Sequence, residues 1–141
     1  MNRVVVDASV AIKWLVPFRQ DEANIDKALA LFEQIARFDV TMIQPPHFIA
    51  EVMAVITRLE PDYAGDIFVA VNDLEMAINE HPETYQTAIR LSVELNHHLF
   101  DTLYHAVALH ASDITLITAD ETYYRKAQSY GQILLLKDYH L

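Results

Sequence analysis

The sequence predicts an α/β fold in which a short parallel β-sheet is covered by helices on both faces. Short apolar runs rich in β-branched residues alternate with longer segments whose apolar residues recur at helical spacing. Strands separated by helices in this way pair in parallel and are buried on both faces. Of the 141 residues, 52% are hydrophobic, so the chain can bury a sizeable core, and we expect one domain over residues 1–141.

The first third of the chain predicts two strands and two helices. Residues 3–6 form an apolar, β-branched run that is typical of a buried strand. A helix is expected from about Ser9 until Pro17 ends it. Apolar residues recur every three or four positions in residues 25–36, which indicates an amphipathic helix. Residues 40–43 are the second predicted strand.

The middle of the chain is expected to be purely helical. Pro46 suits the first turn of a helix that reaches about residue 59. A further helix is expected over residues 61–79, and Pro82 begins the next one.

The last third predicts two helices and two strands. A helix begins at Asp101, and a strand follows over residues 114–117. Residues 121–130 are expected to be helical, and residues 133–136 form the last strand. These patterns do not give the order of the strands in the sheet.

The composition excludes several kinds of site. Without cysteine there are no disulfides, thiolate nucleophiles or zinc–cysteine sites, and two glycines are too few for a glycine-rich phosphate loop. The formal net charge of −10 opposes a broad nucleic-acid-binding surface but suits a small acidic pocket that holds cations. No apolar run approaches the ~20 residues of a membrane span, and the first residues do not resemble a signal peptide. We therefore expect a cytoplasmic protein without a membrane segment.

Four carboxylates are placed where they can meet. In parallel sheets ligands bind beyond the carboxyl ends of the strands, and Asp7 and Asp120 each follow a predicted strand. Glu51 lies on a narrow polar seam of an otherwise apolar helix. Asp101 lies at a helix N-terminus, where the helix dipole favours an anion.

Each acid also has an ordinary structural interpretation. Asp7, Asp101 and Asp120 are good N-cap residues, and Glu51 taken alone is a typical charge on a helix surface. The functional hypothesis rests on the set, because several carboxylates in one cavity repel each other unless cations neutralise them. Mg²⁺ and Mn²⁺ prefer such oxygen ligands.

Four segments that contain these acids resemble, in order, the motifs of the PIN-domain family. They are VVVDASV, IAEV, FDTLYHAVAL and LITADETYY. The chain is most similar to the stand-alone toxin ribonucleases of VapBC toxin–antitoxin modules. The resemblance spans essentially the whole chain. It implies a three-layer α/β/α fold with a short central parallel sheet of about four to five strands and about seven helices.

The resemblance also implies a function and a set of partners. Asp7, Glu51, Asp101 and Asp120 would hold one or two Mg²⁺ or Mn²⁺ ions that activate water for attack on an RNA phosphodiester. Asp7, Asp101 and Asp120 would be direct ligands, and Glu51 would be a ligand or a water-positioning group. Toxins of this family commonly form homodimers and are inhibited by a cognate antitoxin.

Ser9 and Thr118 would fix the rotamers of the carboxylates. Alternatively, Ser9 caps the first helix and Thr118 is an ordinary residue at a strand end. An apolar patch at residues 14–16 would suggest a partner surface if it is exposed.

A few basic residues are candidates for contact with substrate. Lys13, Arg125 and Lys126 lie on helices that begin at the proposed site, and ordinary surface charges are the competing interpretation. His105 lies one helical turn after Asp101, which allows a contact between the two. Packed or solvated side chains are the competing interpretation for His105 and for the other histidines.

Two other functions remain open. A PIN-like binding module without catalysis would need no complete acidic set, but all four acids are present. A small phosphatase would use the strand-end Asp7 as its nucleophile, but that chemistry needs a second aspartate two residues later, where this chain has Ser9.

Overall fold

The computed structural model describes residues 3–18 and 23–140, and these form a parallel five-stranded sheet. The strand order is β3-β2-β1-β4-β5, and every neighbouring pair is parallel. The strands are β1 (Arg3–Val6), β2 (Thr41–Gln44), β3 (Ala77–Ile78), β4 (Ile114–Thr118) and β5 (Ile133–Leu135).

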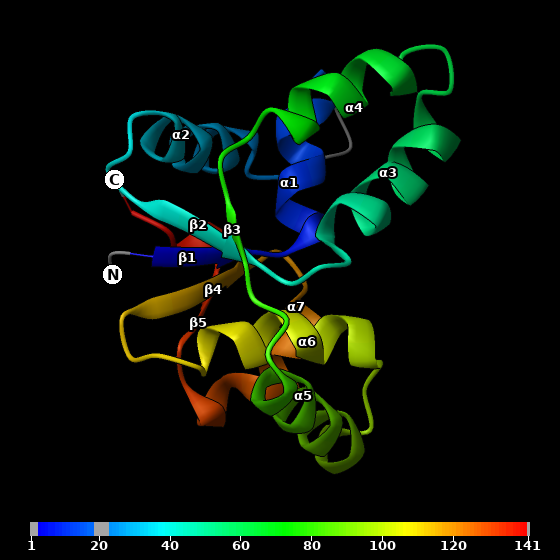
Figure 1. Ribbon diagram of the computed structural model, residues 1–141. Coiled ribbons are helices and arrows are strands. Elements are labelled where there is room, and N and C mark those ends of the chain that lie inside the picture. Colours follow the sequence, from blue (N-terminus) through cyan, green and yellow to red (C-terminus); the bar gives the residue numbers. More distant parts are fainter. Residues whose placement is uncertain (1–2, 19–22, 141) are drawn as a thin grey trace.

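Seven α-helices in the described part of the chain complete three layers, as predicted. They are α1 (Ala8–Leu15), α2 (Ile25–Ala36), α3 (Phe48–Leu59), α4 (Ala64–Asn72), α5 (Pro82–Leu95), α6 (Leu99–Ala108) and α7 (Glu121–Ala127). Helices α1 to α4 lie on one side of the sheet, and α5, α6 and α7 lie on the other (Figure 1). Two short 3-10 helices follow α7 and β5.

The central position of β1 in the sheet explains why its sequence is apolar. It pairs with β2 on one edge and β4 on the other, and helices cover both of its faces. Val4, Val5 and Val6 are therefore fully buried. A strand that is buried on both faces needs an unbroken apolar run rather than an alternating one.

The middle of the chain departs from the prediction. The helix expected over residues 61–79 ends at Asn72, and the chain then forms the two-residue edge strand β3. Ala77 pairs with Ile43, so the prediction of a purely helical middle was wrong. Pairing with a distant edge of the sheet overrode the local helical pattern, which is a common limit of propensity.

Helix α6 begins two residues earlier than predicted. His98 is its N-cap, and the His98 ring accepts a hydrogen bond from the backbone N–H of Phe100. Asp101 therefore lies inside the first turn of α6 rather than at its cap.

The strand order places a ligand crevice at β1 and β4. From β1 the chain moves outward through β2 and β3, then returns to the opposite side of β1 at β4. Ligands bind at such switch points, beyond the carboxyl ends of the strands. None of the helices within residues 3–18 and 23–140 is long and apolar enough to cross a membrane.

Candidate active site

Asp7 follows β1 and is the N-cap of α1. Its carboxylate Oδ2 accepts hydrogen bonds from the backbone N–H of Ser9 at 3.3 Å, from the Ser9 hydroxyl, and from Thr118 Oγ1 at 3.3 Å. The side chain is buried, with the residue only 9% exposed. One oxygen of a buried carboxylate is thus fixed by its neighbours.

Ser9 and Thr118 join the two loops that follow β1 and β4. The backbone N–H of Ala119 donates to Ser9 Oγ at 3.1 Å, and that of Asp120 donates to Thr118 Oγ1 at 3.0 Å. Each hydroxyl therefore contacts Asp7 and also holds the loop that carries Asp120. This is the geometry expected of groups that orient a carboxylate.

Gln44 fixes the end of β1 from the opposite side. Its buried side chain accepts from the N–H of Val6 at 2.7 Å and donates to the carbonyl of Val6 at 2.8 Å. The side chain thereby continues the pairing of β1 with β2 by one more step. Because Val6 directly precedes Asp7, this clamp sets where the aspartate leaves the strand.

Glu51 lies in the first turn of α3, so it reaches the site from the side of the sheet that α1 to α4 cover. Its Oε1 accepts a hydrogen bond from the Tyr104 hydroxyl at 3.2 Å. Its Oε2 lies 3.7 Å from His47 Nε2. The expected polar seam of α3 is therefore the stripe that faces α6.

Asp101 and Asp120 come from the N-terminal ends of α6 and α7. Asp101 Oδ2 is 2.9 Å from His97 Nε2. Asp120 is the N-cap of α7, and its Oδ1 accepts from the N–H of Tyr123 at 3.0 Å.

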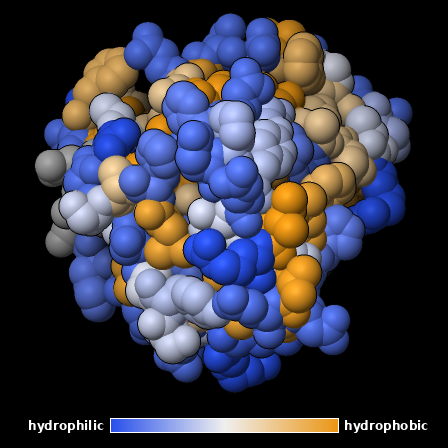
Figure 2. All heavy atoms as spheres, turned by 60° about the horizontal axis from the view of Figure 1, so that its bottom comes forward, coloured by the Kyte–Doolittle hydropathy of each residue, from blue (hydrophilic) through white to orange (hydrophobic). Residues whose placement is uncertain are grey.

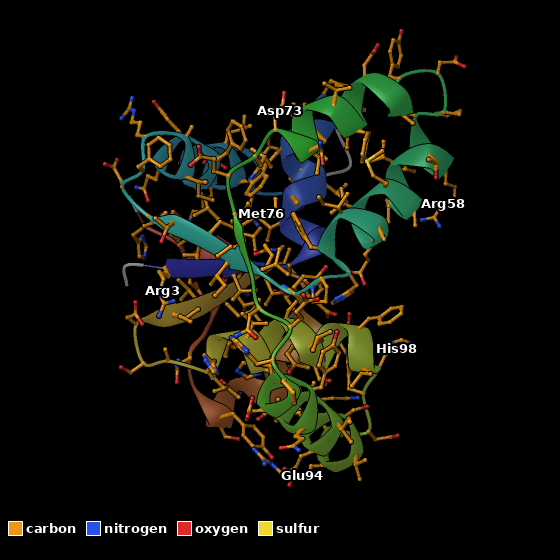
Figure 3. All side chains as sticks on the ribbon, viewed as in Figure 1. Arg3, Arg58, Asp73, Met76, Glu94 and His98 are labelled. Atoms are coloured by element: carbon orange, nitrogen blue, oxygen red, sulfur yellow. The ribbon has the colours of Figure 1, made fainter. Side chains whose placement is uncertain are left out.

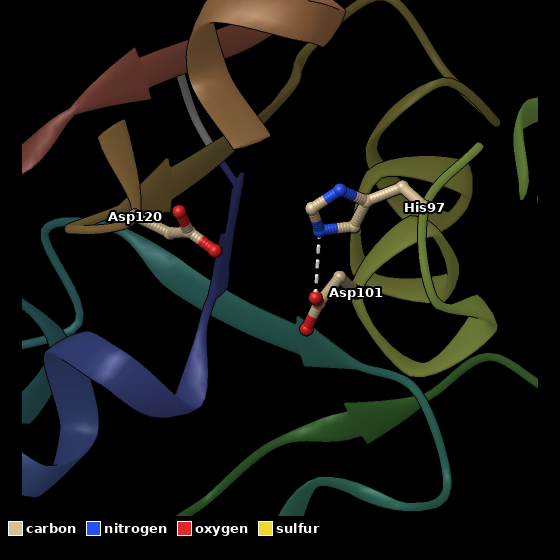
Figure 4. Close-up of side chains that lie close together, drawn as sticks. All are labelled: His97, Asp101 and Asp120. Carbon is tan, nitrogen blue, oxygen red and sulfur yellow. Dashed lines mark hydrogen bonds and ion pairs between the residues drawn. The ribbon is translucent and has the colours of Figure 1, made fainter. Parts of the chain in front are cut away.

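The four acids meet at one edge of the sheet. Ligand atoms of Asp7, Glu51 and Asp101 lie within 4.8 Å of one another, and so do those of His97, Asp101 and Asp120. Asp101 belongs to both groups, so it joins them into one cluster. Figure 4 shows the Asp120 carboxylate facing the hydrogen-bonded pair of His97 and Asp101.

Burial and mutual repulsion raise the pKa values of the two innermost acids. Burial, and then the nearby charges of Asp101 and Asp120, raise the pKa of Asp7 to about 6, although its hydrogen bonds with Ser9 lower it. Burial and the charge of Asp7 raise the pKa of Glu51 to about 7. Burial and the charge of Glu51 also raise the pKa of Tyr104. The site is therefore a poorly solvated cluster of like charges, which a cation would relieve.

The donor set fits a divalent ion with oxygen ligands. Asp7, Asp101 and Asp120 each accept their hydrogen bonds from described residues through a single oxygen, which leaves the second for another ligand. Ligands at about 2.1 Å from one Mg²⁺ ion are separated by at most about 4.2 Å, and the ligand atoms of each group of three residues lie within 4.8 Å of one another. The residues present therefore suit Mg²⁺ or Mn²⁺.

Sequence reasoning missed three side chains that contact these acids, namely His47, His97 and Tyr104. His97 is four residues before Asp101, and that spacing was the available signal. Tyr104 follows Asp101 by three residues and contacts Glu51 on another helix. A contact between two helices cannot be predicted from the local sequence pattern.

The other candidate residues lie in different environments. His105 is fully buried, and its ring bonds the Tyr123 hydroxyl at 2.9 Å and the Gly131 carbonyl at 2.8 Å. Burial lowers its pKa. His105 thus ties α6 to α7 and β5, whereas Asp101 contacts His97. Lys13 is also buried, with 6% of its surface exposed, so it offers little area to a substrate.

The basic residues of α7 differ from each other. Arg125 is exposed. The Lys126 Nζ lies 3.1 Å from the Asn96 carbonyl and 3.2 Å from His97 Nδ1, so the lysine reaches the acidic cluster through His97.

The apolar patch at residues 14–16 is not exposed as a whole. Trp14 and Val16 are buried, and the Trp14 indole donates to the Ala28 carbonyl at 2.8 Å. Trp14 lines a groove of about 670 Å³ between α1, α2 and α4, whose other lining residues include Leu15, Phe18, Phe32, Tyr63 and Ile67.

Two comparisons with known proteins identify a family and a similar fold. A family model described as PIN domain matches residues 4–129. In the crystal structure of VapBC2 from Rickettsia felis bound to a DNA fragment from their promoter, one chain is similar, with a TM-score of 0.66 and 14% identity. The similarity covers 94% of this chain and 96% of that one, and at this identity it shows the fold alone. No curated protein matches the sequence.

Proposed function

The chain belongs to the PIN-domain family, and on this premise we propose that it is a Mg²⁺- or Mn²⁺-dependent ribonuclease. It hydrolyses RNA phosphodiester bonds at the cluster formed by Asp7, Glu51, Asp101 and Asp120. The observation that supports this most is the convergence of these acids, remote in sequence, at the carboxyl edge of the sheet.

We assign the catalytic roles of the four side chains from their environments. One or two bound ions would supply a water of lowered pKa and positive charge beside the leaving oxygen. Asp7, Asp101 and Asp120 would hold the ions through the oxygens that their hydrogen bonds leave available. Glu51 would be a further ligand or would position the attacking water, and the Tyr104 hydroxyl holds its Oε1 at 3.2 Å.

The RNA approaches on the side of the molecule toward which β1 points. Arg58 on α3 and His98 before α6 lie on that side (Figure 3). Arg125 is exposed on the helix that Asp120 caps, and it can contact a phosphate. With a net charge of −10, the chain depends on these few cations and on the bound metal to hold RNA.

The chain also has a surface suited to a protein partner. The groove between α1, α2 and α4 is lined mostly by apolar side chains, with Phe18 and Tyr63 exposed at 66% and 61%. Apolar patches of this kind mark interaction sites. We propose that the chain is the toxin of a toxin–antitoxin pair, that the antitoxin is its partner, and that it works in the cytoplasm as a homodimer.

Metal removal and return test the enzymatic proposal. The purified chain should cleave a single-stranded RNA, lose this activity in a chelator, and regain it with Mn²⁺. Asp7→Asn should remain inactive under all three conditions. Cleavage that survives chelation, or that the mutant retains, would defeat the proposal.

The same preparations separate the alternatives. A phosphatase would release inorganic phosphate from small phosphate esters and leave RNA intact. A binding module would bind RNA or a protein without cleaving it. The Ser9 hydroxyl bonded to Asp7 favours the nuclease, because Ser9 occupies the position where the phosphatase needs its second aspartate.

A further inference from the structure

We propose that His97 is a positioning residue for Asp101, and that Lys126 holds it in this role. The three side chains form one hydrogen-bonded chain from the surface of α7 to the acidic cluster. The expected effect on metal affinity rests on the proposed function, whereas the orientation of the imidazole ring does not.

The His97 ring is held from several directions. It lies in the turn between α5 and α6, where Asn96 ends α5 in the left-handed conformation at φ 49°. The backbone N–H of His97 donates to the Ser92 carbonyl at 3.1 Å, and the His97 carbonyl accepts from the Ser92 hydroxyl. The ring packs edge-on against Tyr123, with centroids 4.9 Å apart. Its side chain is 13% exposed.

The contact with Lys126 fixes which ring nitrogen carries the hydrogen. Lys126 Nζ lies 3.2 Å from His97 Nδ1, and a lysine ammonium group donates hydrogen bonds but accepts none. His97 Nδ1 is therefore the acceptor. In the neutral ring the hydrogen then resides on Nε2, which donates to Asp101 Oδ2 at 2.9 Å (Figure 4).

This orientation makes His97 a support for a metal ligand rather than a ligand itself. A ring nitrogen that carries hydrogen has no lone pair for an ion. The bond to Oδ2 instead fixes the Asp101 carboxylate and leaves Oδ1 for the cluster. Because Asp101 belongs to both ligand groups, its orientation affects all four acids.

The metal-free protein gives the first test. The chain is labelled with ¹⁵N-histidine, and the His97 signals are assigned by their absence in His97→Gln. The ¹H–¹⁵N spectrum of the neutral ring should show hydrogen on Nε2. In Lys126→Met the preference for this tautomer should weaken. A neutral ring with hydrogen on Nδ1 in the wild type overturns the proposal.

Calorimetric titration with Mn²⁺ gives the second test. His97→Phe fills the ring's space but cannot donate, and it should weaken Mn²⁺ binding about 10- to 100-fold, as loss of a ligand's support typically does. His97→Gln keeps a donor near the Nε2 position and should bind within about threefold of the wild type. Lys126→Met should fall between the two variants. Lys27→Met removes an equal charge on α2 and should bind as the wild type does.

Two outcomes would reject the positioning role. One is wild-type Mn²⁺ affinity in folded His97→Phe. The other is a directly bound ¹⁴N in the pulsed electron paramagnetic resonance spectrum of the Mn²⁺-loaded protein that disappears in this variant, since that would make His97 a ligand. If the wild type binds no Mn²⁺ but shows hydrogen on Nε2, the proposed function fails and the hydrogen-bonded chain stands.

Discussion

Asp7 shows how one residue serves the fold and the site together. Its Oδ2 receives the bonds from Ser9 and Thr118, which fix the start of α1 and join it to β4. Hydrogen bonding and burial act oppositely on this carboxylate, and burial is the stronger effect because the pKa rises to about 6. The charged form is therefore held at a cost to stability.

Asp7→Asn should relieve that cost. The mutant removes one buried charge and keeps a side-chain oxygen as an acceptor for Ser9. We expect metal-free Asp7→Asn to melt at or above the temperature of the wild type, while RNA cleavage falls by at least about a hundredfold. Calorimetry and a cleavage assay measure the two effects. Asp39→Asn, at an exposed position, is the matched control and should change neither.

The stability of the metal-free protein should fall as pH rises. Folding raises the pKa of Asp7 from 3.8 to about 6 and that of Glu51 from 4.5 to about 7. The folded state therefore binds these protons more tightly than the unfolded chain. The stabilisation is complete below the unfolded values and is lost as pH rises through the folded ones.

Melting temperatures measured in a chelator between about pH 5 and pH 8 test this sign. The decline should be smaller in Asp7→Asn, because one of the two responsible groups is absent. Identical slopes in the two proteins would show that Asp7 does not titrate in this window.

At the scale of the elements, Gln44 links β2 to the strand that delivers Asp7. Its side chain is fully buried and satisfies both backbone groups of Val6. Gln44→Leu would leave the N–H and the carbonyl unpaired at a cost of about 2–4 kcal/mol of folding free energy. Denaturant unfolding measures this loss. Gln86→Leu, on the exposed side of α5, should cost less than about 0.5 kcal/mol.

The elements also show what the sequence could predict. Strands β1 and β4 were recognisable because burial on both faces demands a continuous apolar run, and the strand-end rule then placed Asp7 and Asp120 together. The edge strand β3 was not recognisable, because two residues carry no periodic signal. The contacts of Gln44, His97 and Tyr104 depend on how separate elements pack, so composition and local spacing could not reveal them.

At the scale of the whole molecule, the chain carries a large excess of negative charge. Acidic residues outnumber lysine and arginine by 20 to 10. On the face shown in Figure 2, hydrophilic residues form most of the surface and hydrophobic ones appear in separate groups. A divalent ion in the cluster would reduce the repulsion among its carboxylates.

Mn²⁺ should consequently stabilise the folded chain. An ion at a hundred times its dissociation constant adds about 2.7 kcal/mol to the free energy of unfolding. Scanning calorimetry with and without Mn²⁺ should show a higher melting temperature for the wild type. Asp7→Asn should gain much less, and an equal gain in both proteins would place the ion elsewhere.

The parallel pairing of β1 with β4 also governs how a newly made chain behaves. Val6 pairs with Ile117, and Asp120 follows a few residues later. While the ribosome is still adding the residues before β4, one edge of β1 has no neighbouring strand. Contacts between such distant segments form late in folding. A nascent chain therefore carries no finished acidic cluster beside the messenger from which it is being translated.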